Sequence, residues 1–184
     1  MRGIGRNEAY AARSPAEADA PALATLWRRS IEELCHADHG GRRDIIESWC
    51  ARKTPERLCS DFADPSLLWL VAETPGGRLA GVGVLHRDGT ILGLYVSPDE
   101  VGRGVGSELL AALLREATDL GHQRVHLEST ATGHAFYAAH GFRDSGAPVV
   151  RLGSVRAFPM VMELPRSGPG TERRFSRSGP RGRT

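Results

Sequence analysis

The sequence has three cysteines, a single lysine and no long apolar run among its 184 residues. The cysteines are odd in number and form no Cys-x-x-Cys pair, so we expect reduced thiols and no disulfide framework. No apolar run approaches the roughly 20 residues that a membrane helix needs, so no membrane partner is expected. The basic residues at the start have no apolar segment behind them, which argues against a signal peptide. We therefore expect a cytoplasmic protein.

Basic residues are concentrated near the C-terminal end. The chain carries a formal charge of +2, but residues 165–184 hold six arginines and one glutamate, leaving 18 basic and 21 acidic residues elsewhere. A mildly acidic body argues against a domain that binds nucleic acid. We expect residues 165–184 to be a disordered tail, because a segment of this composition cannot bury a core. Such a tail can also attract anions or nucleic acid, or lie over a binding site of the body.

Apolar periodicity predicts one domain that contains both helices and strands. The expected helices cover residues 14–34, 45–49, 55–62, 104–120 and 133–140. The expected strands cover residues 7–13, 67–73, 78–86, 90–96, 124–129, 142 onward and 157–164. Short turns join the three strands between 67 and 96, which predicts an antiparallel meander. The strand at 124–129 should run parallel to the one before it, because a helix connects them.

Three glycines at every second position, Gly102, Gly104 and Gly106, lie between the strand ending at Val96 and the long helix. Such a turn collects unpaired backbone N–H groups at a helix N-terminus, which suits a phosphate. The alternative is a tight turn that uses glycine for its backbone freedom alone. A dinucleotide fingerprint would need Gly or Ala where Leu109 stands, and a phosphate-binding P-loop would need a lysine, so both motifs fail.

This stretch resembles the pyrophosphate loop of the GNAT family of acetyl-CoA-dependent N-acetyltransferases, Gln/Arg-x-x-Gly-x-Gly/Ala. The loop matches at Val101-Gly102-Arg103-Gly104-Val105-Gly106. Before it, the family's fourth strand and its exit match Leu94-Tyr95-Val96-Ser97-Pro98. After it, the family's aromatic-Tyr-x-x-x-Gly-Phe segment matches Phe136-Tyr137-Ala138-Ala139-His140-Gly141-Phe142. Val101 departs from the pattern, but the family binds pyrophosphate mainly through backbone amides, which valine also has. The resemblance covers about residues 8–164. It implies an α/β N-acetyltransferase domain over 1–164, with a mixed, mostly antiparallel twisted sheet of about seven strands and helices on both faces.

The resemblance also implies how acetyl-CoA would bind, between the fourth and fifth strands. Backbone amides from Val101 to Ser107 would hold the pyrophosphate, and the splayed strand Leu94–Val96 would pair with the pantetheine arm. Thr130 or Thr132 would replace the asparagine that many members carry there. The implied cofactor-binding residues are Leu94, Tyr95, Val96, Val101, Gly102, Arg103, Gly104, Val105, Gly106, Ser107 and Thr130. No metal is expected, because Cys35, His36 and His39 lack a fourth ligand.

Direct acetyl transfer to a primary amine in a ternary complex needs an unprotonated amine, an oxyanion stabiliser and an acid for the thiolate. The resemblance implies a backbone N–H near Val96 for the oxyanion and Tyr137 for the acid. A phenol, normally with a pKa of ~10, can protonate a thiolate of similar basicity. The alternative is a tyrosine that only packs between Phe136 and Phe142.

Several residues are candidates for the base and for the acceptor pocket. Glu128, which ends a strand near the expected site, is our candidate base, although a water chain could also serve. Glu73 closes another strand, and His36 and His39 stand where the first helix gives way to a loop, so these three are candidate pocket residues. The acceptor could be a small molecule or a peptide: protein N-termini, amino acids, polyamines and aminoglycosides stay open. Family members often form homodimers, but no interface is evident in the sequence.

Two other functions fit the same residues. A CoA-binding or acyl-CoA-sensing module would keep the fold without turnover. A protein that binds anions or nucleic acid through its arginine-rich tail would show salt-sensitive binding that is lost with the tail.

Overall fold

The computed structural model describes residues 10–165. Apart from Pro165, the expected disordered tail lies outside the described residues. The helices are η1 (Glu17–Asp19), α1 (Ala20–Leu34), α2 (His36–His39), α3 (Arg43–Cys50), α4 (Pro55–Phe62), η2 (Pro98–Glu100), α5 (Val105–Asp119) and α6 (Ala131–Ala139). The strands are β1 (Ala11–Arg13), β2 (Leu67–Glu73), β3 (Leu79–His86), β4 (Thr90–Val96), β5 (Arg124–Ser129), β6 (Arg143–Asp144), β7 (Val149–Arg151) and β8 (Val155–Glu163). Within 10–165, no helix has the length and apolar character needed to cross a membrane.

The strands form one eight-stranded sheet in the order β1-β2-β3-β4-β5-β8-β6, with β7 paired to β8. Among residues 10–165, every strand pairing is antiparallel except that between β4 and β5. The expected mixed, mostly antiparallel sheet is thus confirmed. The expected count of about seven strands did not include β7, because Gly146, Pro148 and Gly153 around it are typical of a loop.

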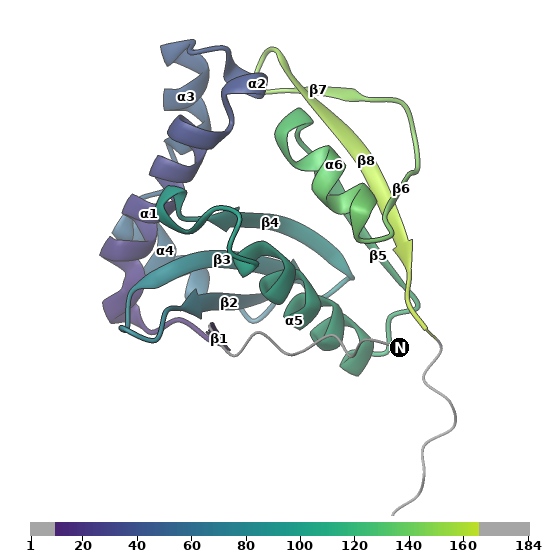
Figure 1. Cartoon of the computed structure of the whole chain (residues 1–184), viewed down its shortest axis with the longest axis horizontal. Helices are drawn as coiled ribbons and strands as arrows, with labels where there is room; N and C mark the ends of the chain where they lie inside the picture. The colour runs from purple at the N-terminus through teal and green to yellow at the C-terminus, as the bar shows by residue number, and fades with distance from the viewer. Residues whose placement is uncertain (1–9, 166–184) are drawn as a thin grey trace, which may run out of the picture.

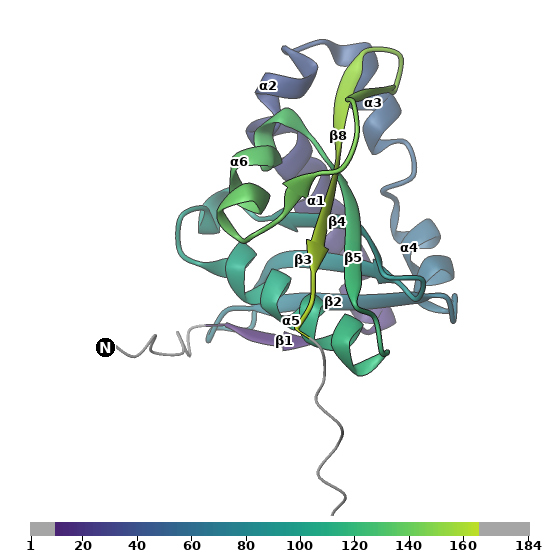
Figure 2. The same ribbon diagram turned by 90° about the vertical axis from the view of Figure 1, so that its right-hand side faces the viewer.

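Helices cover both faces of the sheet (Figure 1). Helix α5 packs on one face of β2–β4, where Leu70 joins a core with Leu109. Helices α1 and α4 pack on the other face, where Val71 joins a second core with Trp27. Neighbouring residues of β2 enter different cores because strand side chains alternate between the two faces. Figure 2 shows that β5 and β8 run across the direction of β2–β4, so the sheet is strongly twisted after β4.

Helix α1 begins later than residue 14, where the sequence predicts the first helix to start. The Asp19 carboxylate accepts a hydrogen bond from the Ala16 backbone N–H at 2.7 Å and from the Arg13 guanidinium at 2.7 Å. This ion pair ties the end of β1 to η1, and α1 begins only at Ala20. The helix begins late because Asp19 binds Arg13 of the preceding strand, a contact that the residues at the start of the predicted helix do not indicate.

Strands β4 and β5 separate after two residue pairs. Thr90 pairs with His126 and Ile91 with Leu127, and the described residues show no further pairing between these strands. On its other side, β4 stays paired with β3 as far as Val96. The β5-facing edge of β4 therefore has free backbone groups along most of its length.

A β-bulge lies where the two strands separate. Gly93 pairs with Val84 and Ile91 pairs with Leu85, so Leu92 is the extra residue of β4. Its side chain is 56% exposed and faces the opening between the strands. Bulges bend and twist a strand, which suits the separation seen here.

Candidate functional site

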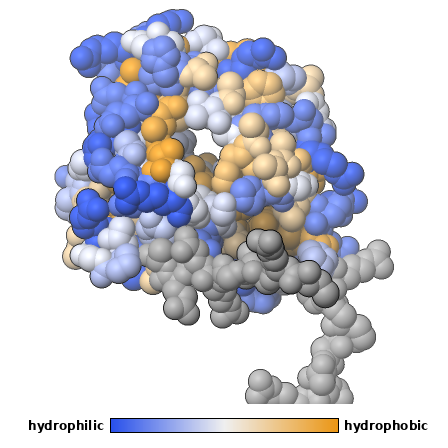
Figure 3. Space-filling model, viewed as in Figure 1, coloured by the Kyte–Doolittle hydropathy of each residue, from blue (hydrophilic) through white to orange (hydrophobic). Residues whose placement is uncertain are grey.

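The split between β4 and β5 opens into a cavity of about 660 Å³. Its walls come from the end of α1, strand β4, residues 100–107, the end of β5 and helix α6. Figure 3 shows the molecule hollowed near the centre of this face, with hydrophobic residues on both sides of the opening.

The cavity reaches both faces of the sheet. Of the β4 residues that line it, Leu94 and Val96 pack with the α5 core, whereas Tyr95 packs with the α1 core. The Tyr95 ring lies 5.1 Å from the Trp27 ring, centroid to centroid. The split thus connects a compartment on the α5 side with a compartment on the α1 side.

Each of the three loop glycines has a structural role. Gly102 has a φ of 77° and Gly104 a φ of 90°, a backbone region that favours glycine. Gly106 allows close packing instead, because a Cβ there would lie 3.3 Å from the ring of Phe136. The loop can therefore approach a ligand without side chains in the way.

The N-terminus of α5 presents unpaired donors to the cavity. Gly104 is the N-cap, and the first hydrogen bond of the helix runs from the Glu108 N–H to the Gly104 carbonyl at 3.1 Å. Within the described part of the chain, no group accepts from the N–H groups of Val105, Gly106 or Ser107. These donors and the helix dipole make an anion-binding site.

The buried carboxylate of Glu100 helps to hold the glycine loop in place. Glu100 is only 4% exposed, and it accepts hydrogen bonds from the Tyr10 hydroxyl at 2.9 Å and from the Arg78 guanidinium at 3.2 Å. Arg103 approaches it at 3.4 Å. A buried charge needs such partners, so this cluster holds the segment between β4 and α5 in one place. Glu100 is not among the predicted site residues, although it is an acidic residue just before the three glycines.

A histidine links α6 to α5 beside the loop. The Nδ1 atom of His140 lies 2.8 Å from the Phe136 carbonyl, and its Nε2 atom lies 3.0 Å from the Ser107 hydroxyl. Since a carbonyl only accepts, Nδ1 donates and a neutral ring accepts from Ser107 at Nε2. The two helices are therefore held together at the anion-binding end of the cavity.

Helix α6 is capped by its own N-cap residue and by a distant carboxylate. The Thr130 hydroxyl accepts from the Gly133 N–H at 3.2 Å. Asp38 of α2 accepts from the backbone N–H groups of Ala131 at 2.7 Å and Thr132 at 3.2 Å, and from the Thr132 hydroxyl at 2.5 Å. Asp38 is not among the predicted site residues, because its partners lie more than ninety residues away in the sequence. These bonds explain why α6 starts earlier than position 133.

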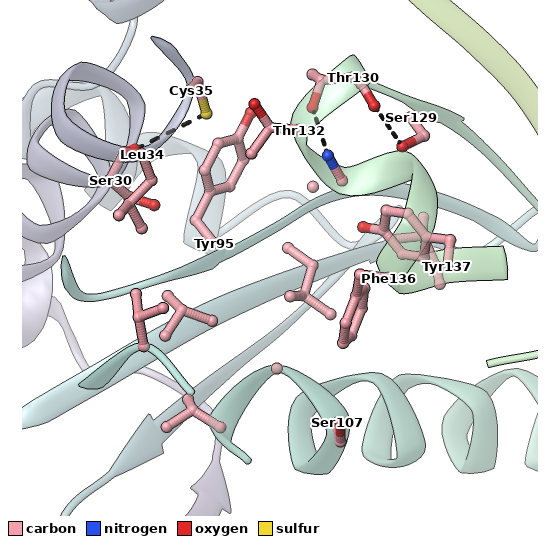
Figure 4. A pocket seen from close by; sticks show the side chains of 18 of the residues that line it. Ser30, Leu34, Cys35, Tyr95, Ser107, Ser129, Thr130, Thr132, Phe136 and Tyr137 are labelled. Carbon is pink, nitrogen blue, oxygen red and sulfur yellow. Dashed lines mark hydrogen bonds between the residues drawn. The ribbon is translucent and has the colours of Figure 1, made fainter. Parts of the chain in front are cut away.

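Tyr137 of α6 lines the cavity. Its ring packs edge-on against Phe136 and Phe142, with centroids 5.2 and 5.5 Å away, and the residue is 8% exposed. Figure 4 shows its hydroxyl pointing into the cavity. No described residue hydrogen-bonds to that hydroxyl. Burial, and secondarily the neighbouring Tyr95, raises the pKa of Tyr137 above its usual value, so the phenol stays protonated at neutral pH.

The compartment on the α1 side is largely apolar. Leu34 and Cys35 line it from the end of α1, and Tyr95 lines it from β4 (Figure 4). Burial, with a smaller contribution from the nearby Asp38 charge, raises the pKa of the Cys35 thiol to about 12. Burial raises the pKa of Tyr95 to about 12 as well. Both groups are therefore neutral at physiological pH.

Glu128 lines the cavity where β5 ends. Leu127 before it and Ser129 after it are buried, whereas Glu128 points to the opposite face, as strand alternation requires. Its two carboxylate oxygens accept from the Nη2 and Nε atoms of Arg151 at 2.6 and 2.9 Å. The pair is a bidentate one at the rim of the cavity.

The structure brings most of the candidate cofactor-binding residues together. All of them except Arg103 line the cavity, as do Thr132, Tyr137 and Glu128. The roles that the sequence predicts for these residues stay predictions. The 10–165 range contains no cluster of histidine, cysteine or carboxylate side chains that could hold a metal ion.

Three other candidates do not line the cavity. Glu73 lies at the end of β2 and binds Arg13 at 2.6 Å. His39 is 2% exposed, with Nε2 at 3.1 Å from the Ile31 carbonyl and Nδ1 accepting from the Gly41 N–H at 3.0 Å, so it holds the turn after α2. His36 stacks edge-on against His39, outside the cavity lining. The sequence placed these residues near the pocket by their position along the chain, but their side chains point elsewhere.

A family model described as acetyltransferase (GNAT) domain matches residues 32–164. A mycothiol acetyltransferase from Clavibacter sepedonicus is 38% identical over 100 residues, which cover 51% of this chain and 33% of the relative. An amino-acid acetyltransferase from Mycobacterium tuberculosis is 38% identical over 114 residues, which cover 58% of this chain and 64% of the relative. The chain thus spans about a third of the first relative and less than two thirds of the second.

Solved structures share the fold over nearly their whole length. A GCN5-related N-acetyltransferase from Rhodopseudomonas palustris has a TM-score of 0.75 and 27% sequence identity, covering 85% of this chain and 97% of that one. The paia N-acetyltransferase from Thermoplasma acidophilum, in complex with coenzyme A, has a TM-score of 0.69 and 21% identity, covering 84% and 99%. At that identity the second match speaks for the fold alone.

Proposed function

Because the chain belongs to the GNAT acetyltransferase family, we propose that it transfers the acetyl group of acetyl-CoA to a primary amine, directly and in a ternary complex. One observation carries this proposal. The cavity crosses the sheet at the β4–β5 split, with an anion-binding loop on one face and a neutral phenol inside. Donor and acceptor can therefore reach the same opening from opposite faces.

The α5 side fits coenzyme A. The unpaired N–H groups of Val105, Gly106 and Ser107 would hold the pyrophosphate. The free edge of β4 from Leu92 to Val96 would pair with the amides of the pantetheine arm, as an added strand does. The thioester would then lie in the split, where a backbone N–H of β4 near Val96 can stabilise the oxyanion.

Tyr137 would serve as the general acid. In the transfer, the amine nitrogen forms a bond to the thioester carbon, the carbon–sulfur bond breaks, and the sulfur takes a proton. The Tyr137 hydroxyl faces the cavity without a protein partner and is protonated at neutral pH, which supports this role (Figure 4). Buried tyrosine hydroxyls usually have a partner, so a free one facing a cavity indicates a ligand-binding role.

Glu128 would bind and orient the acceptor amine. As the base, it would accept a proton from that amine and pass the proton to water. It is the carboxylate at the end of β5, next to the apolar compartment on the α1 side. Glu100 also lines the cavity but is occupied with Tyr10 and Arg78. The high pKa of the Cys35 thiol argues against an acetyl-cysteine intermediate, because the thiolate is the nucleophilic form.

The relatives are named for different compounds, mycothiol and amino acids, and an amino acid carries the kind of amine that the proposal requires. The test is a turnover screen with acetyl-CoA and a panel of amines, combined with the thermal shift produced by CoA. We expect CoA to raise the melting temperature and at least one amine to be acetylated. Stabilisation by CoA without turnover of any amine would instead favour a CoA sensor. A lack of stabilisation by CoA would refute the proposed site.

A further inference from the structure

The ion pair between Glu128 and Arg151 lies at the rim of the cavity. Glu128 lines the cavity on the face that carries α1, and Arg151 reaches it from β7, the short strand paired with the start of β8. The side chains are 42% and 53% exposed, so water and ligands can reach both. Figure 1 shows β7 next to α2 and far from α5.

The pair is not needed to hold its strands. Strand β7 is already paired with β8 from Val149–Ala157 to Arg151–Val155. Apart from Glu128, the only described acceptor of the Arg151 side chain is the carbonyl of its own neighbour, Val150, at 3.5 Å. Half-exposed ion pairs contribute little to stability, so an exchange of partners costs little.

Resting on the proposed function, we propose that Arg151 binds the carboxylate of the acceptor, and that the acceptor is an α-amino acid with an apolar side chain. The acceptor ammonium would replace Arg151 at Glu128, and the acceptor carboxylate would replace Glu128 at Arg151. A compound with an amine and a carboxylate on one carbon can make both contacts at once. The guanidinium binds a carboxylate in a planar, bidentate way, as it already does here.

The surroundings support an apolar side chain. Leu34, Cys35 and Tyr95 line the compartment on the α1 side, and the thiol and phenol are neutral. A second cation or anion of the acceptor would find no partner on these residues. A polyamine would match Glu128 but would place its further charges beside Arg151, which repels them.

The test compares three acceptors that share one side chain: leucine, leucinamide and 3-methylbutylamine. Steady-state kcat/KM is measured with acetyl-CoA for the unaltered chain, for Arg151→Gln and for Arg124→Gln. Arg124 is the matched control, because it forms the same kind of exposed pair across β5 and β8, 2.7 Å from Glu163, away from the cavity lining. Thermal shifts by leucine in the presence of CoA give a second readout that does not depend on turnover.

We expect the unaltered chain to prefer leucine over leucinamide by roughly ten-fold or more, the value of a charge-assisted contact. Arg151→Gln should lower kcat/KM for leucine by a similar factor. It should not lower kcat/KM for the other two acceptors, because they have no carboxylate and no longer compete with Arg151 for Glu128. Leucine should stabilise the CoA complex of the unaltered chain and of Arg124→Gln, but not that of Arg151→Gln.

Three results would overturn the inference. One is equal use of leucine and leucinamide, and another is an equal loss for all three acceptors in Arg151→Gln. The third is acetylation of another amine, such as spermidine or a peptide N-terminus, without use of leucine; this would leave the proposed function intact. Turnover of no amine at all would overturn both.

Discussion

Replacing Tyr137 with phenylalanine removes one hydroxyl from the cavity and leaves the ring in place. The ring contacts with Phe136 and Phe142 are kept, and no hydrogen bond to a described residue is lost. Because the hydroxyl faces the cavity, we expect the free energy of unfolding to change by less than about 1 kcal/mol. For a domain of this size, that corresponds to a change in melting temperature of about 2–4 °C or less.

The same change should have a large effect on turnover. A positioned general acid contributes roughly 10²–10⁴-fold to a rate, so we expect kcat to fall about 100-fold or more while the KM for acetyl-CoA stays near its value. The assay follows the release of free CoA thiol at saturating acceptor. Tyr10→Phe is a suitable control, because it removes a hydroxyl that is bonded to Glu100 at 2.9 Å and should lower stability but not kcat. An unchanged kcat in Tyr137→Phe across pH would refute the acid role.

The pH dependence gives a second check on this residue. Burial raises the pKa of Tyr137 above the unfolded value near 10, so the folded chain keeps the phenol protonated where the unfolded chain ionises. Its contribution to stability is fully present below pH ~10 and is lost as the pH rises toward the folded pKa. We expect no alkaline loss of kcat from this group below pH ~10. An alkaline limb near pH 8 that disappears in Tyr137→Phe would contradict the raised pKa.

Three further substitutions test the loop, the thiol and the cap. Gly104→Ala places a side chain at a φ of 90°, which costs roughly 1–2 kcal/mol, and we expect a lower melting temperature and a KM for acetyl-CoA raised by about ten-fold. Cys35→Ala should keep kcat within about twofold, and intact mass of the unaltered chain with acetyl-CoA alone should show no acetyl adduct, since burial raises the thiol pKa to about 12. Asp38→Ala removes three hydrogen bonds to the start of α6. We expect it to lower the free energy of unfolding by about 1–2 kcal/mol and also to lower kcat. The control Asp44→Ala, at an exposed carboxylate, should change neither quantity.

The sequence predicted best those elements whose signals are local. The strands at 67–73, 90–96 and 124–129 have the predicted bounds, because turn residues flank each apolar run. The parallel step from β4 to β5 followed from the helix between them, and the structure confirms it. The glycine turn was predicted as well, because Gly102 and Gly104 adopt positive φ angles, which the residue type itself favours.

The rest depends on contacts between distant parts of the chain. The carboxylate of Asp38 was not singled out, although it lies between two histidines that were, because its partners Ala131 and Thr132 belong to another helix. His39 was a candidate for the acceptor pocket, but its two ring nitrogens are hydrogen-bonded to the Ile31 carbonyl and the Gly41 N–H. The residue type determines which chemistry a side chain can perform, whereas the tertiary contacts determine whether its polar atoms are free to perform it.

The two sides of the cavity differ in how they would bind their ligands. The α5 side presents backbone N–H groups, which every residue type except proline has, so Val101 can stand where the family prefers Gln or Arg. The α1 side presents side chains, with Glu128 and Arg151 as its charged pair. A substitution on the first side would thus change affinity for one common donor, whereas a substitution on the second would change which acceptor fits. On the proposed function, the residues at the end of β5 and on β7 would therefore decide which acceptor is used, and the glycine loop would not.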